Sequence, residues 1–166
     1  GVGDENAAEN RRADLWDTLL SGGGIEIYCG YFPGPLGGDL TMEDFSTREE
    51  TWTYLRVARE FLRQNVNFQA MQPADELVSG EAGAFGGAEA MREPGVSIVV
   101  YLPSTTNEAR VDLSDESGVW TKRWFDPRTG ELHPAEVVLA GGEVEVGVPP
   151  SGAGEDWALL FEKDGE

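Results

Sequence analysis

The sequence predicts an α+β protein: the last strand and helices of a (β/α)8 barrel at residues 1–67, followed by an antiparallel β-sandwich at residues 68–166. Three observations lead to this prediction. Apolar residues at helical spacing flank one short strand in the first part. Seven short strand-like runs, separated by turn signals, fill the second part. The first part alone also cannot bury its own apolar faces.

The first helix is predicted over residues 9–20, where apolar residues recur at helical spacing and charged residues occupy the remaining positions. Ser-Gly-Gly-Gly at residues 21–24 should end it, because glycine supplies the backbone freedom that a helix C-terminus needs. A short strand is then predicted at Ile25–Gly30, with alternate side chains on opposite faces. A loop rich in glycine and proline follows, over residues 31–45.

Two overlapping capping boxes predict the start of the second helix. Ser46 pairs with Glu49 and Thr47 with Glu50, each at the spacing of a reciprocal cap. The helix should reach about Asn65 and bury a wide apolar stripe against a sheet or a barrel wall. Its apolar residues are Trp52, Tyr54, Leu55, Ala58, Phe61 and Leu62.

After a connector at residues 68–80, the chain reads as short strands and turns, which fits a sandwich of antiparallel sheets. The strands are predicted at about Ala84–Ala90, Val96–Leu102, Ala109–Leu113, Val119–Phe125, Ala135–Leu139, Glu143–Val148 and Trp157–Lys163. Gly141-Gly142, between two alternating runs, is the strongest hairpin signal. Asp126-Pro-Arg-Thr-Gly130 predicts a tight turn.

The helix, strand and helix predicted at residues 1–67 include a single strand whose edges have no partner strand to pair with. Either this strand joins the sandwich or the segment belongs to something larger, and a (β/α)8 barrel repeats the same units. In a barrel, Glu26 and Tyr28 would point inward, and the loop from Tyr31 would lie at the C-terminal mouth, where barrel active sites are found.

Composition excludes several classes of function. The chain holds 31 acidic residues against 12 Lys and Arg, a net charge of −19. Such a surface repels phosphate backbones and anionic lipids, so no nucleic-acid or membrane partner is expected. No apolar run is long enough to span a bilayer, and residues 1–5 do not resemble a signal peptide. No sequence pattern predicts a cofactor or a metal ion.

Several motifs resemble the last part of the barrel in apiosidase-like glycoside hydrolases, together with the C-terminal β-domain that accompanies such barrels and carries a collagen-binding family label. In the barrel part they are Arg12-Ala-Asp-Leu-Trp16, Tyr28-Cys-Gly-Tyr31 and Gly38-Asp-Leu40; in the β-domain they are Tyr101-Leu-Pro103, Trp124-Phe-Asp-Pro-Arg-Thr-Gly130, Pro149-Pro150 and Asp156-Trp-Ala-Leu-Leu160. Together they cover most of the chain, and the β-domain motifs are the more specific.

The resemblance implies that Ile25–Gly30 is the eighth barrel strand, with helix seven before it and helix eight after it. It also implies a secreted or periplasmic protein that acts on glycosides or polysaccharide. The two catalytic carboxylates of such hydrolases usually lie near the ends of strands four and seven, which would precede residue 1. No catalytic residue is therefore expected in this chain, and its partners would be carbohydrate and the remainder of the barrel, in the same protein or a companion chain.

Four residues are the candidate substrate-binding set: Glu26, Tyr28, Tyr31 and Phe32. Inside a barrel, Glu26 could hydrogen-bond sugar hydroxyls or tune a catalytic acid, although an ion pair with a barrel arginine is the favoured interpretation. The three aromatic side chains could stack on sugar rings at the mouth. Ordinary packing beneath the loop explains each of them equally well.

For several other residues a structural role is favoured over a functional one. The acidic loop residues Asp39, Glu43 and Asp44 could coordinate calcium, but a solvated loop is favoured because no EF-hand pattern is present. His133 is the chain's only histidine and lies outside any triad motif. Cys29, in an apolar run, is interpreted as a small buried hydrophobe.

Trp120, Trp124 and Trp157 could form an exposed carbohydrate-binding platform, but burial in the core is favoured. Three functions remain open: the C-terminal part of a glycoside-hydrolase-like protein, a non-catalytic module that binds carbohydrate or protein, or a sandwich that only stabilises its own barrel. The apolar helix faces favour the first and third, because a free-standing module would not need them.

Overall fold

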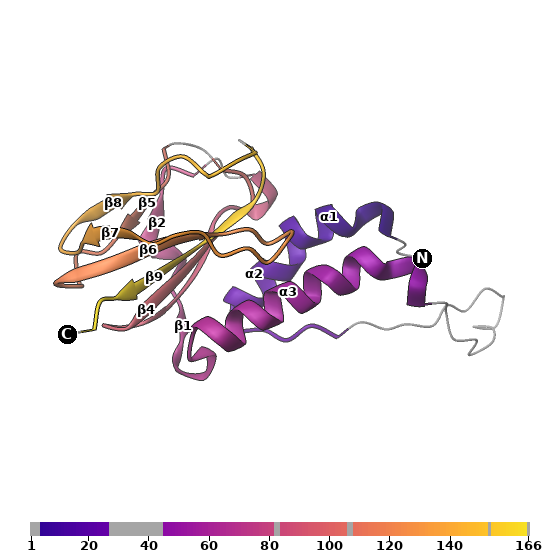
Figure 1. Cartoon of the computed structure of the whole chain (residues 1–166), viewed down its shortest axis with the longest axis horizontal. Helices are drawn as coiled ribbons and strands as arrows, with labels where there is room; N and C mark the ends of the chain where they lie inside the picture. The colour runs from indigo at the N-terminus through magenta and orange to yellow at the C-terminus, as the bar shows by residue number, and fades with distance from the viewer. Residues whose placement is uncertain (1–3, 27–44, 82–83, 106–107, 153, 166) are drawn as a thin grey trace.

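The computed structural model describes residues 4–26, 45–81, 84–105, 108–152 and 154–165. Two antiparallel sheets form a sandwich at one end of the molecule, and a pair of long helical segments extends from it toward the N-terminus (Figure 1). The predicted fold class is confirmed: helices pack beside an antiparallel β-sandwich in an α+β chain.

One sheet has six strands in the order β1-β3-β4-β9-β6-β7, and the other has three in the order β2-β5-β8. The six-stranded sheet consists of β1 (Gln72–Pro73), β3 (Glu89–Glu93), β4 (Ser97–Leu102), β9 (Trp157–Lys163), β6 (Val119–Phe125) and β7 (Glu136–Leu139). The three-stranded sheet consists of β2 (Val78–Ser79), β5 (Arg110–Asp112) and β8 (Glu143–Glu145). The bounds of β6 and β9 match the prediction residue for residue.

The first helical segment covers residues 7–20 and begins two residues earlier than predicted. It consists of α1 (Ala7–Asn10), a π-helical turn, η2 (Arg11–Leu15), and α2 (Trp16–Leu20). The predicted glycine stop is confirmed: Ser21 N–H donates to the carbonyl of Asp17, and Gly22 adopts a φ of +79°.

The second helix, α3 (Glu49–Asn65), follows the 3-10 turn η3 (Phe45–Arg48). A residue far away in the sequence caps it: the carboxylate of Asp4 accepts hydrogen bonds from the N–H groups of Glu50 (2.9 Å) and Thr51 (3.0 Å). The Asp4 carboxylate therefore satisfies two of the free donors at this helix end and joins the start of the chain to α3.

The remaining 3-10 turns are η1 (Asp4–Asn6), η4 (Phe68–Ala70), η5 (Asp75–Leu77) and η6 (Ala84–Gly86). The segment predicted as a connector, residues 68–80, thus holds η4, η5 and the short strands β1 and β2. The strand predicted at Ala84–Ala90 is shifted to Glu89–Glu93, because η6 occupies the earlier residues. Isolated pairs of strand residues have no sequence pattern of their own.

One correction concerns Gly141-Gly142. The pair was predicted to close a hairpin, but β7 before it pairs with β6, and β8 after it pairs with β5 in the other sheet. Gly141, with a φ of +104°, therefore carries the chain from one sheet to the other. The tight turn predicted from Asp126 is confirmed, since Gly130 N–H donates to the Asp126 carbonyl and Gly130 has a φ of +84°.

The first core lies between the two sheets. The predicted burial of the sandwich tryptophans is confirmed: Trp120, Trp124 and Trp157 are all buried there. Trp124 and Trp157 meet edge to face, with ring centroids 5.8 Å apart. The indole N–H of Trp157 donates to the Ser151 carbonyl at 3.1 Å, so this buried ring has a hydrogen-bond partner.

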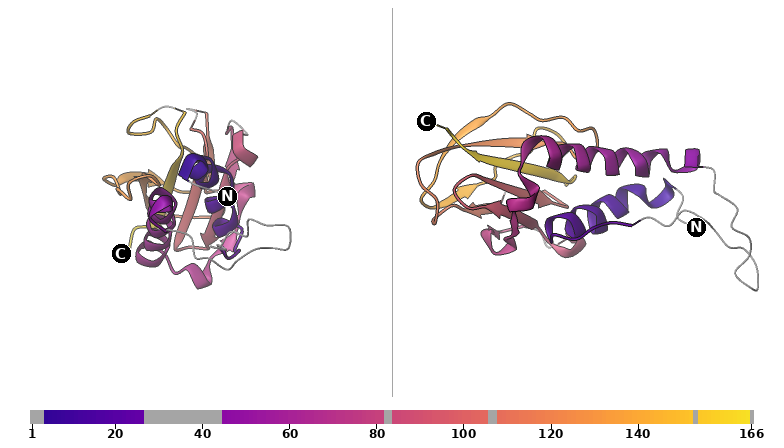
Figure 2. Two further views of the ribbon diagram at one scale, coloured as in Figure 1. Left: turned by 90° about the vertical axis from the view of Figure 1, so that its right-hand side faces the viewer. Right: turned by 90° about the horizontal axis from the view of Figure 1, so that it is seen from below.

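The second core lies on the other face of the six-stranded sheet, where both helices pack (Figure 2). Trp16 is completely buried and stacks on Tyr101, with ring centroids 5.1 Å apart and planes 7° apart. Phe61 of α3 and Phe125 of β6 pack edge-on against the same indole. One sheet therefore separates two apolar cores.

The sandwich covers only part of the apolar helix surface. Trp16 and Leu62 are buried, whereas Leu19, Trp52 and Leu55 are half-exposed. The prediction that these faces are covered is met where the helices reach the sheet. Farther toward the N-terminus, the helices extend past the sheet (Figure 2).

The strand predicted at Ile25–Gly30 lies largely outside the described residues. Ile25 and Glu26, which are described, form no strand.

Candidate functional site

A buried ion pair joins the first helical segment to the sandwich. Arg11 Nε donates to Asp156 Oδ2 and Arg11 Nη2 donates to Asp156 Oδ1, each at 2.7 Å. The hydroxyl of Tyr101 donates to the same carboxylate at 2.8 Å. Because both charged side chains are almost completely shielded from water, the bidentate geometry fixes the position of the helix on the sheet.

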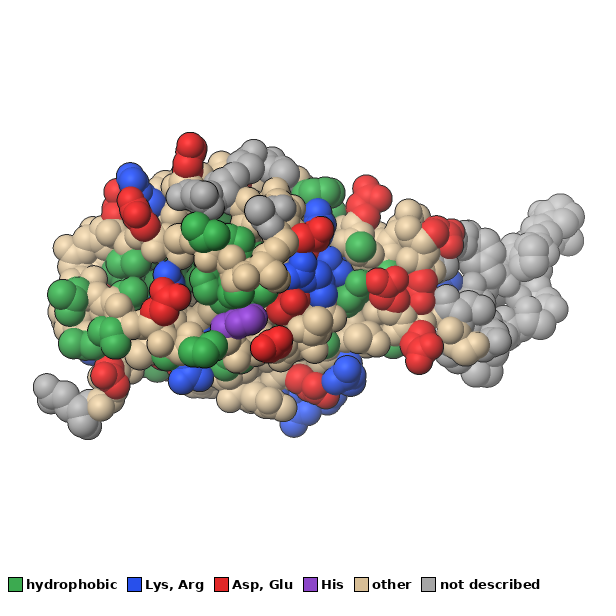
Figure 3. Space-filling view, turned by 45° about the horizontal axis from the view of Figure 1, so that its top comes forward, with side chains coloured by type: hydrophobic (Ala, Val, Ile, Leu, Met, Phe, Trp, Pro, Cys, Tyr) green, Lys and Arg blue, Asp and Glu red, His purple; other side chains and the backbone are tan. Residues whose placement is uncertain are grey.

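More charged groups surround this pair. Arg12 forms an ion pair with Glu155, and its Nε lies 3.3 Å from Asp156 Oδ1. Arg128, which forms an ion pair with Asp126, lies 3.6 Å from Glu155. Basic side chains gather where the helices meet the sandwich (Figure 3). These side chains and Arg11 make three cations against three carboxylates, so the junction is a neutral network.

The pKa values of two members of this network, Arg11 and Tyr101, are both raised. Burial alone would lower the pKa of Arg11, but the hydrogen bonds and charge of Asp156 raise it above its ordinary value. Burial raises the pKa of Tyr101, and the neighbouring Asp156 carboxylate raises it further. Both shifts favour a charged Arg11 and a neutral Tyr101.

A groove runs between the two helical segments, away from the sheet. It comprises two adjoining pockets of about 420 and 550 Å³ that share Leu15, Ile25 and Leu55. Its floor is apolar, and both helices contribute to it. The apolar lining residues are Ala7, Leu15, Leu19, Ile25, Leu55, Leu62, Val66 and Phe68.

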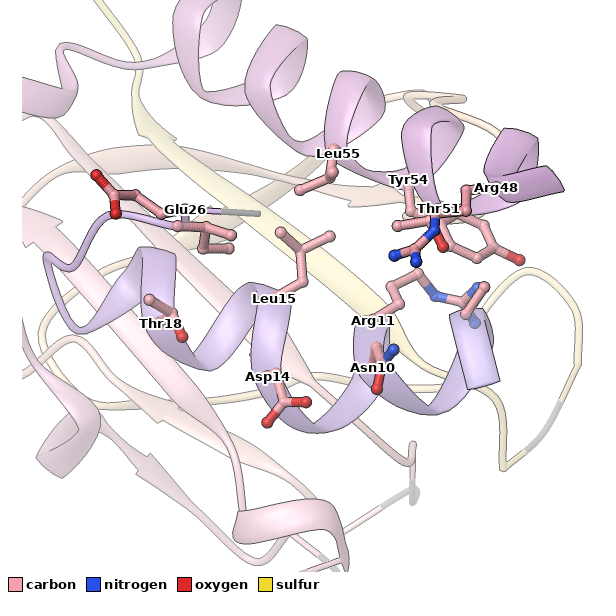
Figure 4. Close-up of a pocket in the computed structure, with 12 residues that line it drawn as sticks. Asn10, Arg11, Asp14, Leu15, Thr18, Glu26, Arg48, Thr51, Tyr54 and Leu55 are labelled. Atoms are coloured by element: carbon pink, nitrogen blue, oxygen red, sulfur yellow. The ribbon is translucent and has the colours of Figure 1, made fainter. Parts of the chain in front are cut away.

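The end of the groove nearest the N-terminus is polar. Figure 4 shows Arg11 and Arg48 next to one another there, with Thr51 and Tyr54 of α3 beside them. Both arginines are buried, and the Arg11 guanidinium lies 4.2 Å from the centre of the Tyr54 ring. Among the described residues, Arg11 Nη1 has no hydrogen-bond partner although it is buried.

Glu26 is the only member of the predicted substrate-binding set among the described residues. It is exposed and lies at the opposite end of the same pocket from Arg48 (Figure 4). Tyr28, Tyr31 and Phe32 lie outside the described residues, as do Cys29 and the acidic loop that contains Asp39. The structure therefore does not test the predicted set as a group.

The structure also contains a carboxylate cluster that no local sequence pattern predicts, because its three members come from distant segments. Burial raises the pKa of Glu89 in β3 to about 7, and the nearby carboxylates of Asp75 and Asp17 contribute further. Asp75 also accepts a hydrogen bond from the Ala90 N–H at 2.8 Å. A raised carboxyl pKa is typical of a general acid, but none of these three carboxylates lines the groove.

The sandwich presents no tryptophan platform, since its three tryptophans are buried. His133 packs against Trp157, with ring centroids 5.5 Å apart. Within the described part of the chain, no group of three or more His, Cys, Asp or Glu residues is arranged to hold a metal ion. No described helix is long and apolar enough to cross a membrane.

Solved structures that share this fold include two glycoside hydrolases. A glycoside hydrolase family 5 protein from Bacteroides vulgatus matches 94% of the chain with a TM-score of 0.67 and 17% identity. A second structure, of a protein described as a glycoside hydrolase, matches 80% with a TM-score of 0.61 and 20% identity. The chain corresponds to 36% and 31% of those chains, so it spans about a third of their length.

No curated protein matches the chain. A family model does match it, over residues 73–162, which include strands of both sheets. The family is described as "Putative collagen-binding domain of a collagenase". Because the match covers more than half of the 166 residues, the chain belongs to this family.

Proposed function

We propose that the chain is the C-terminal part of an apiosidase-like glycoside hydrolase that acts on glycosides or polysaccharide outside the cytoplasm. In this proposal residues 1–67 complete a barrel, and residues 68–166 form an ancillary sandwich that braces its last helices. The buried Arg11–Asp156 pair is the observation that carries the proposal. A sandwich that bound its ligand independently would not need a desolvated, bidentate bond to a neighbouring helix.

The aromatic residues support bracing over carbohydrate binding. Trp120, Trp124 and Trp157 fill the core between the sheets, and Trp16 fills the core between sheet and helices. A sugar platform needs exposed aromatic faces. The sandwich uses its largest rings to stabilise the fold instead.

The second candidate function is a non-catalytic binding module, and the family description supports its protein-binding form. The sandwich could bind a carbohydrate or an extracellular protein such as collagen, through a surface without tryptophan. Retention of the purified chain on immobilised collagen or insoluble polysaccharide, at a strength that survives 0.5 M salt (roughly three times physiological ionic strength), would support this alternative over bracing.

The direct test of the leading proposal is hydrolysis of a panel of aryl glycosides by the purified chain, Gly1 to Glu166. We expect no turnover, because the paired carboxylates of the barrel would lie on the part that this chain does not contain. Combining the chain with the remainder of the proposed barrel, in the same protein or as a companion chain, should produce turnover.

Glu89→Gln serves as the matched control, because the pKa of Glu89 is raised by burial and by the nearby carboxylates of Asp75 and Asp17. Turnover by the chain alone that disappears in Glu89→Gln would assign catalysis to that cluster and contradict the proposal. Turnover by the joined protein should be unchanged in Glu89→Gln.

A further inference from the structure

Phe85, in the turn η6, differs from the other aromatic residues. It is 43% exposed and belongs to neither apolar core, whereas the other aromatic side chains whose exposure the structure describes are buried or half-buried. We infer that Phe85, Arg12 and Glu155 form a weak binding site for one neutral sugar unit of a polysaccharide. This inference rests on the proposed action on glycosides and adds a sugar contact outside the barrel.

The backbone of Phe85 is the first argument. Its φ is +54° and its ψ is +33°, which is the left-handed conformation, and among the described residues no other except glycine has a positive φ. This conformation is unfavourable for a residue with a Cβ, whereas a glycine would adopt it without that cost. Strained residues of this kind cluster at ligand sites. An exposed phenyl ring at such a position therefore indicates a ligand contact.

The surroundings of the ring are the second argument. The Arg12 guanidinium lies 5.6 Å from the ring centre, and this cation–π contact helps to hold the ring in place. A Cβ at Gly86 would have no atom within 4 Å, so nothing crowds the chain beside the ring. The exposed part of the ring is therefore accessible to the apolar face of a sugar, which stacks on aromatic faces.

The polar groups near the ring are held in place by contacts within the chain. Arg12 forms an ion pair with Glu155, whose side chain is 44% exposed. The N–H and the hydroxyl of Thr105 both donate to the Glu155 carbonyl oxygen, each at 3.1 Å, so the backbone that carries this carboxylate is fixed. A sugar hydroxyl can donate to a carboxylate and accept from a guanidinium, and the ion pair supplies both partners.

The chemistry of the site favours a neutral sugar over a protein segment or an acidic glycan. A protein contact is strongest inside a desolvated apolar patch, whereas Phe85 lies next to an ion pair. An acidic glycan would be repelled by Glu155 and by the net charge of −19. One ring and one ion pair make a small contact, so we expect a dissociation constant of about 1 mM, too weak for retention on a column.

The test is an NMR titration of the ¹⁵N-labelled chain, Gly1 to Glu166, with neutral oligosaccharides of glucose, xylose, mannose, galactose and arabinose. At least one of them should shift the amide signals of Phe85, Gly86 and Glu155 at about 1 mM. Phe85→Gly removes the ring and the backbone strain together. It should weaken binding at least about tenfold, while the melting temperature stays within about 2 °C of the parent's.

Four further variants separate the ring face from packing. Phe85→Leu keeps apolar bulk without a flat face and should weaken binding as much as Phe85→Gly does, whereas Phe85→Tyr keeps the face and should bind like the parent. If Phe85→Gly does not fold, this pair decides the question. Glu155→Ala removes the hydrogen-bond acceptor and should weaken binding about tenfold. The matched control is Val137→Ala, which removes exposed apolar surface on β7 and should leave affinity unchanged.

No signal shift with any of these sugars, or binding that Phe85→Leu leaves unchanged, would overturn the inference. So would a Phe85-dependent complex with collagen peptides but with no sugar, which would assign this surface to a protein partner. Turnover by the complete hydrolase without sugar binding at Phe85 would remove this inference and leave the proposed function standing. Sugar binding through Phe85, by a chain that forms no hydrolase with the remainder of the barrel, would do the reverse.

Discussion

The sandwich and the helix pair both have apolar faces, and the two regions bury these faces to different extents. The inner strands of the six-stranded sheet, β3, β4, β6 and β9, bury one face against the smaller sheet and the other against the helices, and β4 is buried at every residue. The helices bury one side on that sheet and leave a groove on the other. The inner strands of the sandwich are thus covered on both faces, whereas the helix pair is covered only in part.

The two regions also differ in the kind of interaction that stabilises them. Between the sheets the core is almost wholly apolar, and the buried Lys122 has its ammonium 2.8 Å from the Val146 carbonyl and 3.0 Å from Glu136. Between helices and sheet, an aromatic cluster around Trp16 is joined to the Arg11–Asp156 network. Apolar burial stabilises the sandwich, whereas the junction combines burial with fixed, directional bonds.

Trp157→Ala tests the sandwich side of this comparison and should have the largest effect. Removing this buried ring should cost roughly 3–5 kcal/mol, a large share of a small domain's stability. A thermal melt of the purified variant measures the loss. An unchanged melting temperature, combined with lost retention on a polysaccharide, would make the carbohydrate-binding interpretation the better one.

Arg11→Met tests the junction. Leaving the Asp156 carboxylate buried without its bidentate partner should cost about 3 kcal/mol, measured by urea unfolding. Hydrogen exchange should increase in both helices, while β4 and β9 stay protected. The double variant Arg11→Met/Asp156→Leu should recover most of the loss, because it removes the second buried charge as well. Equal loss of protection in helices and strands would show that the two regions unfold as one unit.

Glu89→Gln should have the smallest effect, and it depends on pH. In the folded protein the pKa of Glu89 is raised to about 7 from an ordinary 4.5, so the native state holds this proton more tightly than the unfolded chain does. The resulting stabilisation is complete below about pH 4.5 and is lost as pH rises to about 7.

Glutamine mimics the protonated form. Glu89→Gln should therefore melt like the parent protein at pH 4.5 and higher than it at pH 8, by on the order of a few degrees. Melting curves across this range provide the measurement, with Glu76→Gln, at an exposed neighbouring position, as the control. The same pH slope in the parent and Glu89→Gln would mean that Glu89 does not titrate in this way.

Some elements could be predicted from local pattern alone. β6 and β9 lie where predicted because their strand-forming residues are bounded by clear turn signals. The first helix ends at Ser21 because the glycines beyond it favour a helix stop in any context. Burial of the tryptophans also follows from the general preference of large rings for the core.

Other features depend on partners that are distant in sequence. Gly141-Gly142 is typical of a hairpin, but only strand pairing decides whether a glycine pair closes one sheet or joins two. Asp4 caps α3 from 46 positions away, which no local window can detect. The same holds for the candidate site. Glu26 was predicted as an inward-pointing side chain of the barrel strand expected at Ile25–Gly30, whereas Arg11 and Arg48 were not predicted.

By itself the sequence determined the two main helical segments, the strands β4, β6 and β9, the acidic charge and the apolar stripes that require burial. Local backbone preferences and side-chain periodicity encode these properties, so they can be recognised residue by residue. Only the tertiary structure decided that Arg11 meets Asp156 across 145 positions and that the helices cover one face of the six-stranded sheet. Bidentate bonds, raised pKa values and grooves require groups to meet within a few ångströms, and folding brings those groups together from distant parts of the chain.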